Sequence, residues 1–152
     1  MAMFRVGNLM AVLSAALVAS AIAAVAPRVV TLTVDDTMKY NVATIEAKPG
    51  EELIVRLVSK GTLPAMAGGH NFVLVKKDTN LDAFTTAAVM ARDTEYILAK
   101  FAAAVLAKTK LVGPGETVEV RFKAPTAPGS YPYFCSFPGH YAAGAKGMLI
   151  VK

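Results

Sequence analysis

The sequence contains one cysteine, two histidines and no tryptophan in 152 residues. A single cysteine excludes a disulfide within the chain, so the thiol is unpaired, linked to another molecule or used as a ligand. Charged residues make up only 18% of the sequence, and the formal net charge is +5. Lysine and arginine are scattered without interleaved aromatic residues, so no feature favours nucleic-acid binding. The charge supports no more than a mild preference for anionic partners.

Motifs for common enzyme chemistry are missing as well. The chain has no nucleophilic-serine motif, no glycine-rich phosphate loop and no pair of carboxylates spaced for acid–base work. We therefore expect a protein that is not an enzyme.

Hydrophobic residues make up 55% of the sequence, and the first 26 residues are especially rich in them. There Arg5 precedes an apolar run of about 17 residues, from Leu9 to Val25, that ends among small residues. This pattern is typical of a secretory signal peptide. The run is also at the short limit for a membrane-spanning helix, so residues 1–26 are either a signal peptide or an N-terminal membrane anchor. Both readings predict a periplasmic or extracytoplasmic protein.

Residues 28–152 predict one all-β domain. Its β-branched or alternating segments are separated by turns such as Pro49-Gly50 and Gly113-Pro114-Gly115. About seven to eight short strands with turns of this kind favour a β-sandwich. The expected strands cover residues 29–34, 41–47, 53–58, 70–76, 117–123, 130–136 and 146–152.

One segment departs from the strand pattern. Residues 81–108 are rich in alanine and carry Leu81, Phe84 and Ala88 at helical spacing, with Asn80 or Thr79 as the possible N-cap. We therefore expect a helical insertion, about residues 80–108, that packs on the sandwich as an amphipathic cover.

The candidate metal ligands are His70, Cys135 and His140. A lone histidine in an apolar setting is most often a core residue, but two histidines with the only cysteine suit copper, because soft sulfur favours Cu(I) and imidazole suits both oxidation states. Cys135 ends an expected strand, and His140 follows the tight Pro138-Gly139 turn. One loop can therefore return His140 to the same ion, and a neighbouring strand can bring His70 to it.

Two segments carry a family resemblance. LPAMAGGHNFVLV (residues 63–75) and CSFPGHYAAGAKGMLIVK (residues 135–152) resemble the first-histidine segment and the copper loop of the azurin and auracyanin branch of the cupredoxins. The resemblance extends over residues 29–152. It implies a Greek-key cupredoxin β-sandwich, with the helical insertion that azurins and auracyanins also have.

The same resemblance implies a ligand set for one copper ion per chain. His70 and His140 supply imidazole nitrogen and Cys135 supplies thiolate. The backbone carbonyl of Gly69 is a weak axial contact. Asn71 ties the first-histidine strand to the copper loop by hydrogen bonds, and backbone N–H groups near the sulfur tune the reduction potential.

The chain departs from the family at the axial methionine position, where it has Ala145. Met148 lies an odd number of strand residues away and should face the opposite side, and no spacing aims Met66 at the metal. We expect a three-coordinate site in which the Gly69 carbonyl or a water is the weak fourth contact. Loss of a thioether favours Cu(I) and raises the potential, whereas a water ligand acts in the opposite direction. The apolar surroundings favour the higher potential.

Function follows from the resemblance. It implies a type 1 copper protein that shuttles one electron between extracytoplasmic redox partners through Cu(I) and Cu(II). Those partners, a cytochrome or a membrane electron-transfer complex, would dock near His140 on an apolar patch of Pro138, Tyr141, Ala142 and Met66. Two alternatives stay open: a periplasmic copper carrier or storage protein, and an open-site copper protein with altered redox chemistry, including a copper enzyme. Membrane association, where present, would come through residues 1–26.

Overall fold

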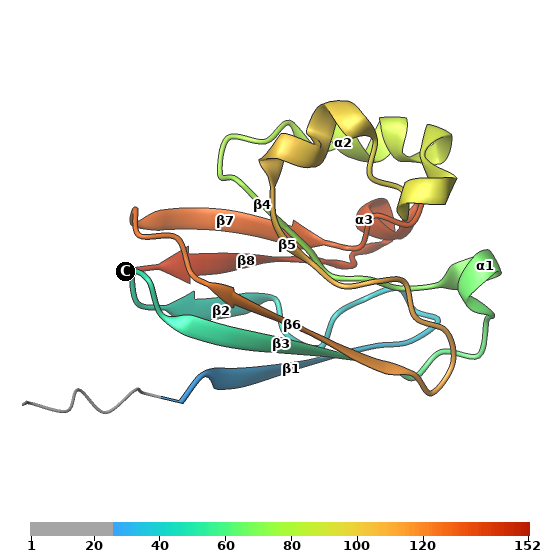
Figure 1. The fold of residues 1–152 in the computed structure, drawn as a ribbon. Helices are drawn as coiled ribbons and strands as arrows, with labels where there is room; N and C mark the ends of the chain where they lie inside the picture. The colour runs from blue at the N-terminus through green and yellow to red at the C-terminus, as the bar shows by residue number, and fades with distance from the viewer. Residues whose placement is uncertain (1–25) are drawn as a thin grey trace, which may run out of the picture.

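Two β-sheets face each other across one core in the computed structural model, which describes residues 26–152 (Figure 1). The predicted signal peptide or anchor lies outside the described residues except for its last position. No helix within residues 26–152 has the length and apolar character needed to cross a membrane. The strands are β1 (Arg28–Val34), β2 (Thr44–Ala47), β3 (Glu52–Ser59), β4 (Val73–Val75), β5 (Val105–Lys108), β6 (Thr117–Lys123), β7 (Gly129–Phe134) and β8 (Lys146–Val151).

The strand order defines a three-stranded sheet, β1-β3-β6, and a five-stranded sheet, β2-β8-β7-β4-β5. The pairs β1–β3 and β2–β8 are parallel, and the other neighbours are antiparallel. Eight strands in two sheets confirm the predicted sandwich. The helices are α1 (Ala65–Gly68), α2 (Leu81–Ala87) and α3 (His140–Ala143), with three 3-10 helices η1 (Ala88–Met90), η2 (Arg92–Thr94) and η3 (Ala99–Ala104).

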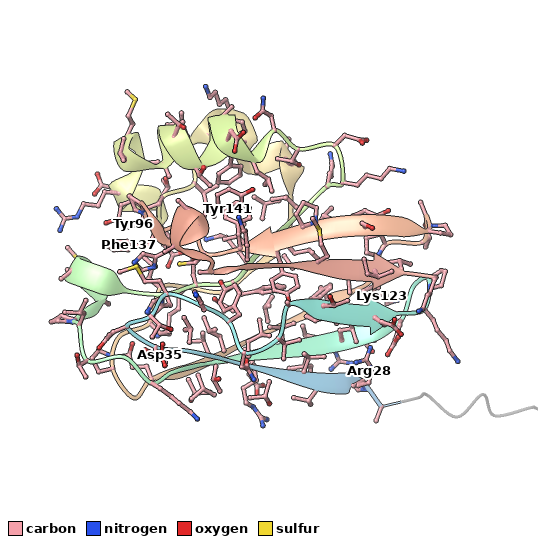
Figure 2. All side chains as sticks on the ribbon, turned by 180° about the vertical axis from the view of Figure 1, so that it is seen from behind. Arg28, Asp35, Tyr96, Lys123, Phe137 and Tyr141 are labelled. Atoms are coloured by element: carbon pink, nitrogen blue, oxygen red, sulfur yellow. The ribbon has the colours of Figure 1, made fainter. Side chains whose placement is uncertain are left out.

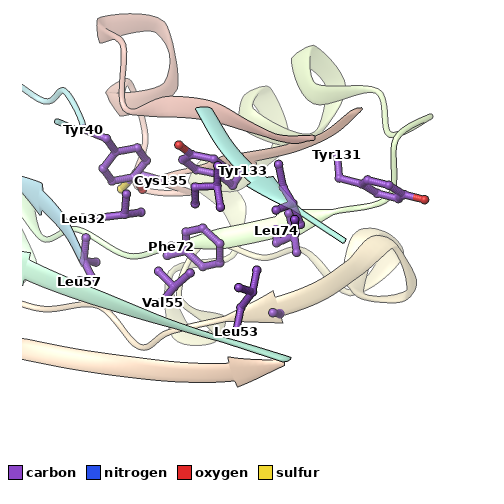
Figure 3. Close-up of a cluster of buried hydrophobic side chains, with 14 of the residues drawn as sticks. Leu32, Tyr40, Leu53, Val55, Leu57, Phe72, Leu74, Tyr131, Tyr133 and Cys135 are labelled. Carbon is purple, nitrogen blue, oxygen red and sulfur yellow. The ribbon is translucent and has the colours of Figure 1, made fainter. Parts of the chain in front are cut away.

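The main core lies between the sheets. It forms because apolar side chains alternate with more exposed ones along the strands, so that one face of each strand is apolar. In β3 the side chains of Leu53, Val55 and Leu57 are fully buried (Figure 3). They point toward Phe72, which directly precedes β4, and toward Tyr133 of β7. Burial of each such side chain contributes roughly 1.5–3 kcal/mol relative to exposure. Cys135 belongs to the same cluster, so this core extends to the candidate ligand.

A second, smaller core lies under the insertion, on the outer face of the five-stranded sheet. Phe84 of α2 stacks on Phe101 at 4.7 Å between ring centroids and meets the ring of Phe134 edge-on at 5.1 Å. Asn80 caps α2 as predicted, because its side-chain oxygen accepts from the N–H of Ala83 at 2.9 Å. The insertion therefore covers the sheet, as expected from its apolar spacing.

The predicted helical boundary at residue 108 is wrong by four residues. Val105–Lys108 form β5, an edge strand in which Ala107 lies opposite Leu74 of β4. The alanine-rich sequence favours a helix locally, but pairing with β4 satisfies the backbone groups of both segments.

Two predicted strands are shorter than expected. β2 covers residues 44–47, not 41–47, and β4 covers residues 73–75, not 70–76. His70 instead makes an isolated antiparallel bridge with Val112. All three residues of β4 are buried, because Leu74 faces the main core while Val73 and Val75 face the insertion. A strand covered on both faces shows no alternation in its sequence.

Candidate metal centre

The first-histidine segment is fixed by backbone contacts on both sides. His70 exchanges two hydrogen bonds with Val112, of 3.0 and 2.9 Å. Before it, the N–H of Gly69 donates to the carbonyl of Ala65 in α1 at 3.0 Å. A Cβ on Gly69 would lie 2.5 Å from that carbonyl oxygen, so only glycine fits. The segment LPAMAGGH thus needs glycine directly before the histidine.

The second segment is a closed loop that starts where β7 ends. Gly139 and Gly144 flank the short helix α3 with φ of 86° and 119°, conformations that other residues rarely adopt. The N–H of Cys135 donates to the carbonyl of Ala145 at 3.0 Å, and the N–H of Ala145 donates to the carbonyl of His140 at 2.9 Å. Residue 145 therefore fixes both ligand-bearing residues through its backbone.

These segments bring the three predicted ligands together at one end of the sandwich. One ligand atom from each of His70, Cys135 and His140 lies within 4.8 Å of the others. The Sγ of Cys135 is 3.4 Å from the Nδ1 of His140, and the two imidazole centroids are 4.8 Å apart. Cys135 is fully buried and each histidine is 2% exposed. The cluster is therefore enclosed by protein.

The cluster fits a single copper ion. Among the described residues, the Nδ1 of His70 is the one buried side-chain nitrogen or oxygen without a hydrogen-bond partner. A buried polar atom without a partner costs free energy unless a ligand satisfies it. Bonds of about 2.0 Å to imidazole and about 2.3 Å to thiolate, as in zinc sites, put a nitrogen and a sulfur donor roughly 3.7 Å apart in a trigonal site. The Sγ–Nδ1 distance of 3.4 Å is close to that spacing.

Burial holds the three groups in their neutral forms when no cation is bound. It raises the pKa of the Cys135 thiol to about 11, while hydrogen bonds from the backbone of Asn71 and Phe137 act in the opposite direction. Burial lowers the pKa of His140 to about 4, and the neighbouring His70 acts in the same direction. Neutral imidazoles are ready to bind a metal, and a bound cation makes the thiolate favourable.

The surroundings of the sulfur contain the backbone groups that the resemblance implies. The backbone N–H groups of Asn71 and Phe137 act on the Cys135 thiol in the direction that lowers its pKa, as donors near a thiolate do. The carbonyl oxygen of Gly69 lies 3.9 Å from the same sulfur and therefore faces the cluster. The Gly69 carbonyl is thus near the cluster, and its role as a weak axial contact stays a prediction.

Asn71 joins the two ligand-bearing segments. Its Oδ1 accepts from the N–H of Ser136 at 2.9 Å, and its Nδ2 donates to the hydroxyl of Ser136 at 2.8 Å. Both residues are buried. The hydroxyl of Tyr40 donates to the carbonyl of Asn71 at 2.5 Å. These bonds fix the distance between the histidine strand and the cysteine loop.

Sequence reasoning missed two of the residues in this network. Ser136 is adjacent to Cys135, and its position in the loop was the only available signal. Tyr40 is about 30 residues before Asn71 and gives no sequence signal for its contact, because the contact depends on how the chain between Val34 and β2 folds over the core.

At the axial position Ala145 is fully buried. The two methionines considered as substitutes are solvent-exposed, Met66 by 67% and Met148 by 43%. Met148 lines a surface pocket of 190 Å³ together with Leu81 and Tyr141. Both residues are thus exposed, unlike the enclosed ligand cluster. That neither replaces the thioether stays a prediction.

Comparison with known proteins places the chain in a family. The family model of copper-binding proteins of the plastocyanin/azurin type matches residues 28–152. Azurin from Pseudomonas chlororaphis is 36% identical over 120 residues, which cover 77% of this chain and 92% of that protein. Outer membrane protein H.8 from Neisseria meningitidis serogroup B is 37% identical over 114 residues, which cover 74% of this chain. The chain spans 61% of the length of that H.8 protein.

Solved structures agree with the sequence comparison. The auracyanin of Roseiflexus castenholzii has a TM-score of 0.71 and 29% identity, covering 84% of this chain and 98% of its own. Auracyanin A of Chloroflexus aurantiacus, described as a "blue" copper protein, has a TM-score of 0.73 and 26% identity, with 84% and 100% coverage. The chain belongs to the plastocyanin/azurin family of copper-binding proteins, in its azurin and auracyanin branch, and its cofactor is one copper ion.

Proposed function

We propose that this member of the plastocyanin/azurin family carries one electron between extracytoplasmic redox partners, on a copper ion held by His70, Cys135 and His140. The observation that supports this most strongly is the unpartnered Nδ1 of His70, buried beside the Sγ of Cys135 and the Nδ1 of His140. The bound copper supplies the exchange between Cu(I) and Cu(II). The protein chain holds the copper ligands in place, sets the reduction potential and provides the surface that contacts redox partners.

The first task is to hold the donors still. His70 is fixed by its two hydrogen bonds to Val112, and Cys135 by its hydrogen bond to Ala145. Asn71 joins their segments through Ser136. A donor set that keeps its geometry on gain and loss of an electron needs little rearrangement, which favours fast transfer. This rigidity favours an electron carrier over an enzyme that must admit a substrate.

The second task is to set the reduction potential. Ala145 offers a methyl group where the family has a thioether, and the adjacent carbonyl of Gly69 is a weak donor. The enclosed cluster disfavours a water ligand. We therefore expect Cu(I) to be favoured and the potential to be higher than in an Ala145→Met variant.

The third task is to meet partners. The loop residues Pro138, Tyr141 and Ala142 lie beside His140, and Met66 of α1 is 67% exposed. A small apolar patch made of these residues would support weak, short-lived docking of a cytochrome or a membrane electron-transfer complex. An extracytoplasmic location, with residues 1–26 as signal peptide or anchor, is supported by the N-terminal sequence pattern and by the similarity to a protein named as an outer membrane protein.

The proposal is tested by loading the purified chain with Cu(II) and recording its visible absorption during a redox titration. We expect an intense thiolate-to-copper band that disappears on reduction and returns fully on oxidation. Cys135→Ser should remove the band, whereas Met90→Ala, at an exposed site in the insertion, should leave it unchanged. A chain that binds copper without this band, or that loses its copper in each cycle, would contradict electron transfer and favour a copper carrier.

A further inference from the structure

The turn between η2 and η3 in the insertion has an unusual backbone. Glu95 and Tyr96 are adjacent and both adopt left-handed conformations, with φ of 57° and 63°. Non-glycine residues rarely adopt this conformation, and a bulky one such as tyrosine does so less than most. Two in succession persist only where surrounding contacts hold them.

Those contacts lead directly to the metal-binding loop. The hydroxyl of Ser136 donates to the backbone carbonyl of Glu95 at 2.7 Å. The ring of Tyr96 meets the ring of Phe137 edge-on, with centroids 4.9 Å apart. Phe137 in turn stacks on the imidazole of His140 at 4.6 Å. The turn therefore touches both residues that follow Cys135 in the loop. Figure 2 shows Tyr96 and Phe137 side by side at this end of the molecule.

The same turn is anchored on its other side to the segment that holds His70. The carboxylate of Glu95 pairs with Lys108 at 2.8 Å and accepts from the N–H of Leu111 at 3.2 Å. Leu111 precedes Val112, the residue that bridges to His70. Glu95 thus connects the backbone next to one ligand with the loop that carries the other two.

We infer that Glu95 and Tyr96 are positioning residues for the copper site, through which the insertion holds the loop of Cys135 and His140 in one geometry. The inference rests on the proposed copper site and assigns the insertion a task beyond covering the sheet. Without the ring of Tyr96, Phe137 loses one of its two aromatic contacts and keeps only the stacking on His140. The loop then gains freedom to move while Asn71 and the backbone of residue 145 still hold its ends.

Tyr96→Asn separates the ring contact from backbone strain. Asparagine tolerates the left-handed conformation better than tyrosine does, so the turn should keep its shape while its contact with Phe137 is lost. We expect copper release to a chelator to become on the order of tenfold faster, at the lower end of the effect of removing a ligand's support. We also expect a shifted reduction potential. Tyr96→Phe should restore both, and Met90→Ala, an exposed insertion residue, should change neither.

A second pair of variants covers the case in which Tyr96→Asn does not fold. Glu95→Gln removes the charge that pairs with Lys108. Its control is Glu119→Gln on β6, which removes the exposed pair with Arg56 of β3. We expect faster copper release for Glu95→Gln than for Glu119→Gln. The inference is overturned if Tyr96→Asn keeps both the potential and the release rate of the wild type, or if Glu95→Gln behaves as Glu119→Gln does. Absence of the thiolate band in the wild type would instead remove the proposed function itself.

Discussion

Figure 2 marks the two ends of the sandwich by Tyr96 and Phe137 at one and Arg28 at the other, and these ends differ in the burial of their polar side chains. At the end that contains Tyr96 and Phe137, the polar residues His70, Asn71 and Ser136 are buried, with at most 2% exposure. At the end near Arg28, charged residues form ion pairs in water. Arg28 pairs with Glu51 at 2.7 Å and Lys152 pairs with Glu46 at 2.6 Å.

This difference in burial indicates which contacts determine the function. A buried polar group that loses its partner keeps its full desolvation cost, so each contact at the copper end is tightly constrained. An exposed ion pair exchanges partners with water at little cost and is screened by salt. Substitutions should therefore have large effects at the copper end and small ones at the charged end.

The largest effect on stability is expected for Asn71→Ala. It leaves the buried N–H of Ser136 without an acceptor and removes the link between the histidine strand and the cysteine loop. We expect a loss of about 3 kcal/mol in the free energy of unfolding of the apoprotein, measured by urea denaturation. Copper release should also become faster. Unchanged stability and release would show that the link has no role.

In the copper-free protein, acid should destabilise the two ends in different pH ranges. The pKa of His140 is lowered by burial to about 4, so the unfolded chain binds its proton first as the pH falls. The contribution of His140 to the free energy of unfolding is therefore fully present above pH 6.5. It decreases as the pH falls from about 6.5 to 4, by at most about 3 kcal/mol. At the charged end the pKa of Glu51 is lowered by Arg28, so its contribution decreases only below its ordinary value of 4.5.

Urea denaturation of the apoprotein at a series of pH values measures both contributions. His140→Gln should reduce the decrease between pH 6.5 and 4 and leave the decrease below pH 4.5 in place. The decrease that remains between pH 6.5 and 4 comes from His70, whose pKa is also lowered by burial. A wild-type apoprotein with constant stability down to pH 4.5 would contradict the neutral, buried state of His140.

A smaller loss is expected for Tyr40→Phe. The variant removes the hydroxyl that donates to the buried carbonyl of Asn71. We expect a loss of about 1–2 kcal/mol in the free energy of unfolding. Tyr131→Phe is the matched control, because that hydroxyl donates to the carbonyl of Ala127 at 2.8 Å in a less buried place. Equal losses in the two variants would remove the distinction between buried and accessible contacts.

The smallest effect is expected for Glu51→Gln at the charged end. It breaks the pair with Arg28, and exposed pairs contribute at most about 1 kcal/mol. The reduction potential and the rate of copper release should match the wild type, and the small loss of stability should vanish in high salt. A change in potential would show that the charged end acts on the copper site.

The sequence predicted the sandwich because most strands have one face in the core and therefore alternate. β6, with the sequence TVEVRFK, is the clearest example. The prediction failed where that rule does not apply. β5 lies at an edge within an alanine-rich segment, and its strand conformation depends on β4, a long-range partner. Local composition does not encode such a partner.

The ligand cluster was predictable for a different reason. His70, Cys135 and His140 are the only residues of their types in the sequence, and two of them lie within one short loop. Their supports were not predictable to the same degree. Glu95 and Tyr96 reach the loop only because the insertion folds back over the sheet, and no spacing in the sequence indicates that path.

The most direct test of the electron carrier is X-ray absorption at the copper edge for the loaded protein in both oxidation states. We predict two imidazole nitrogens and one sulfur at bonding distance in Cu(II) and in Cu(I), with bond lengths that change little on reduction. Ala145→Met, recorded in the same way, should add a weak sulfur contact and lower the potential. A ligand gained or lost on reduction, or a strong fourth ligand in the wild type, would contradict the account.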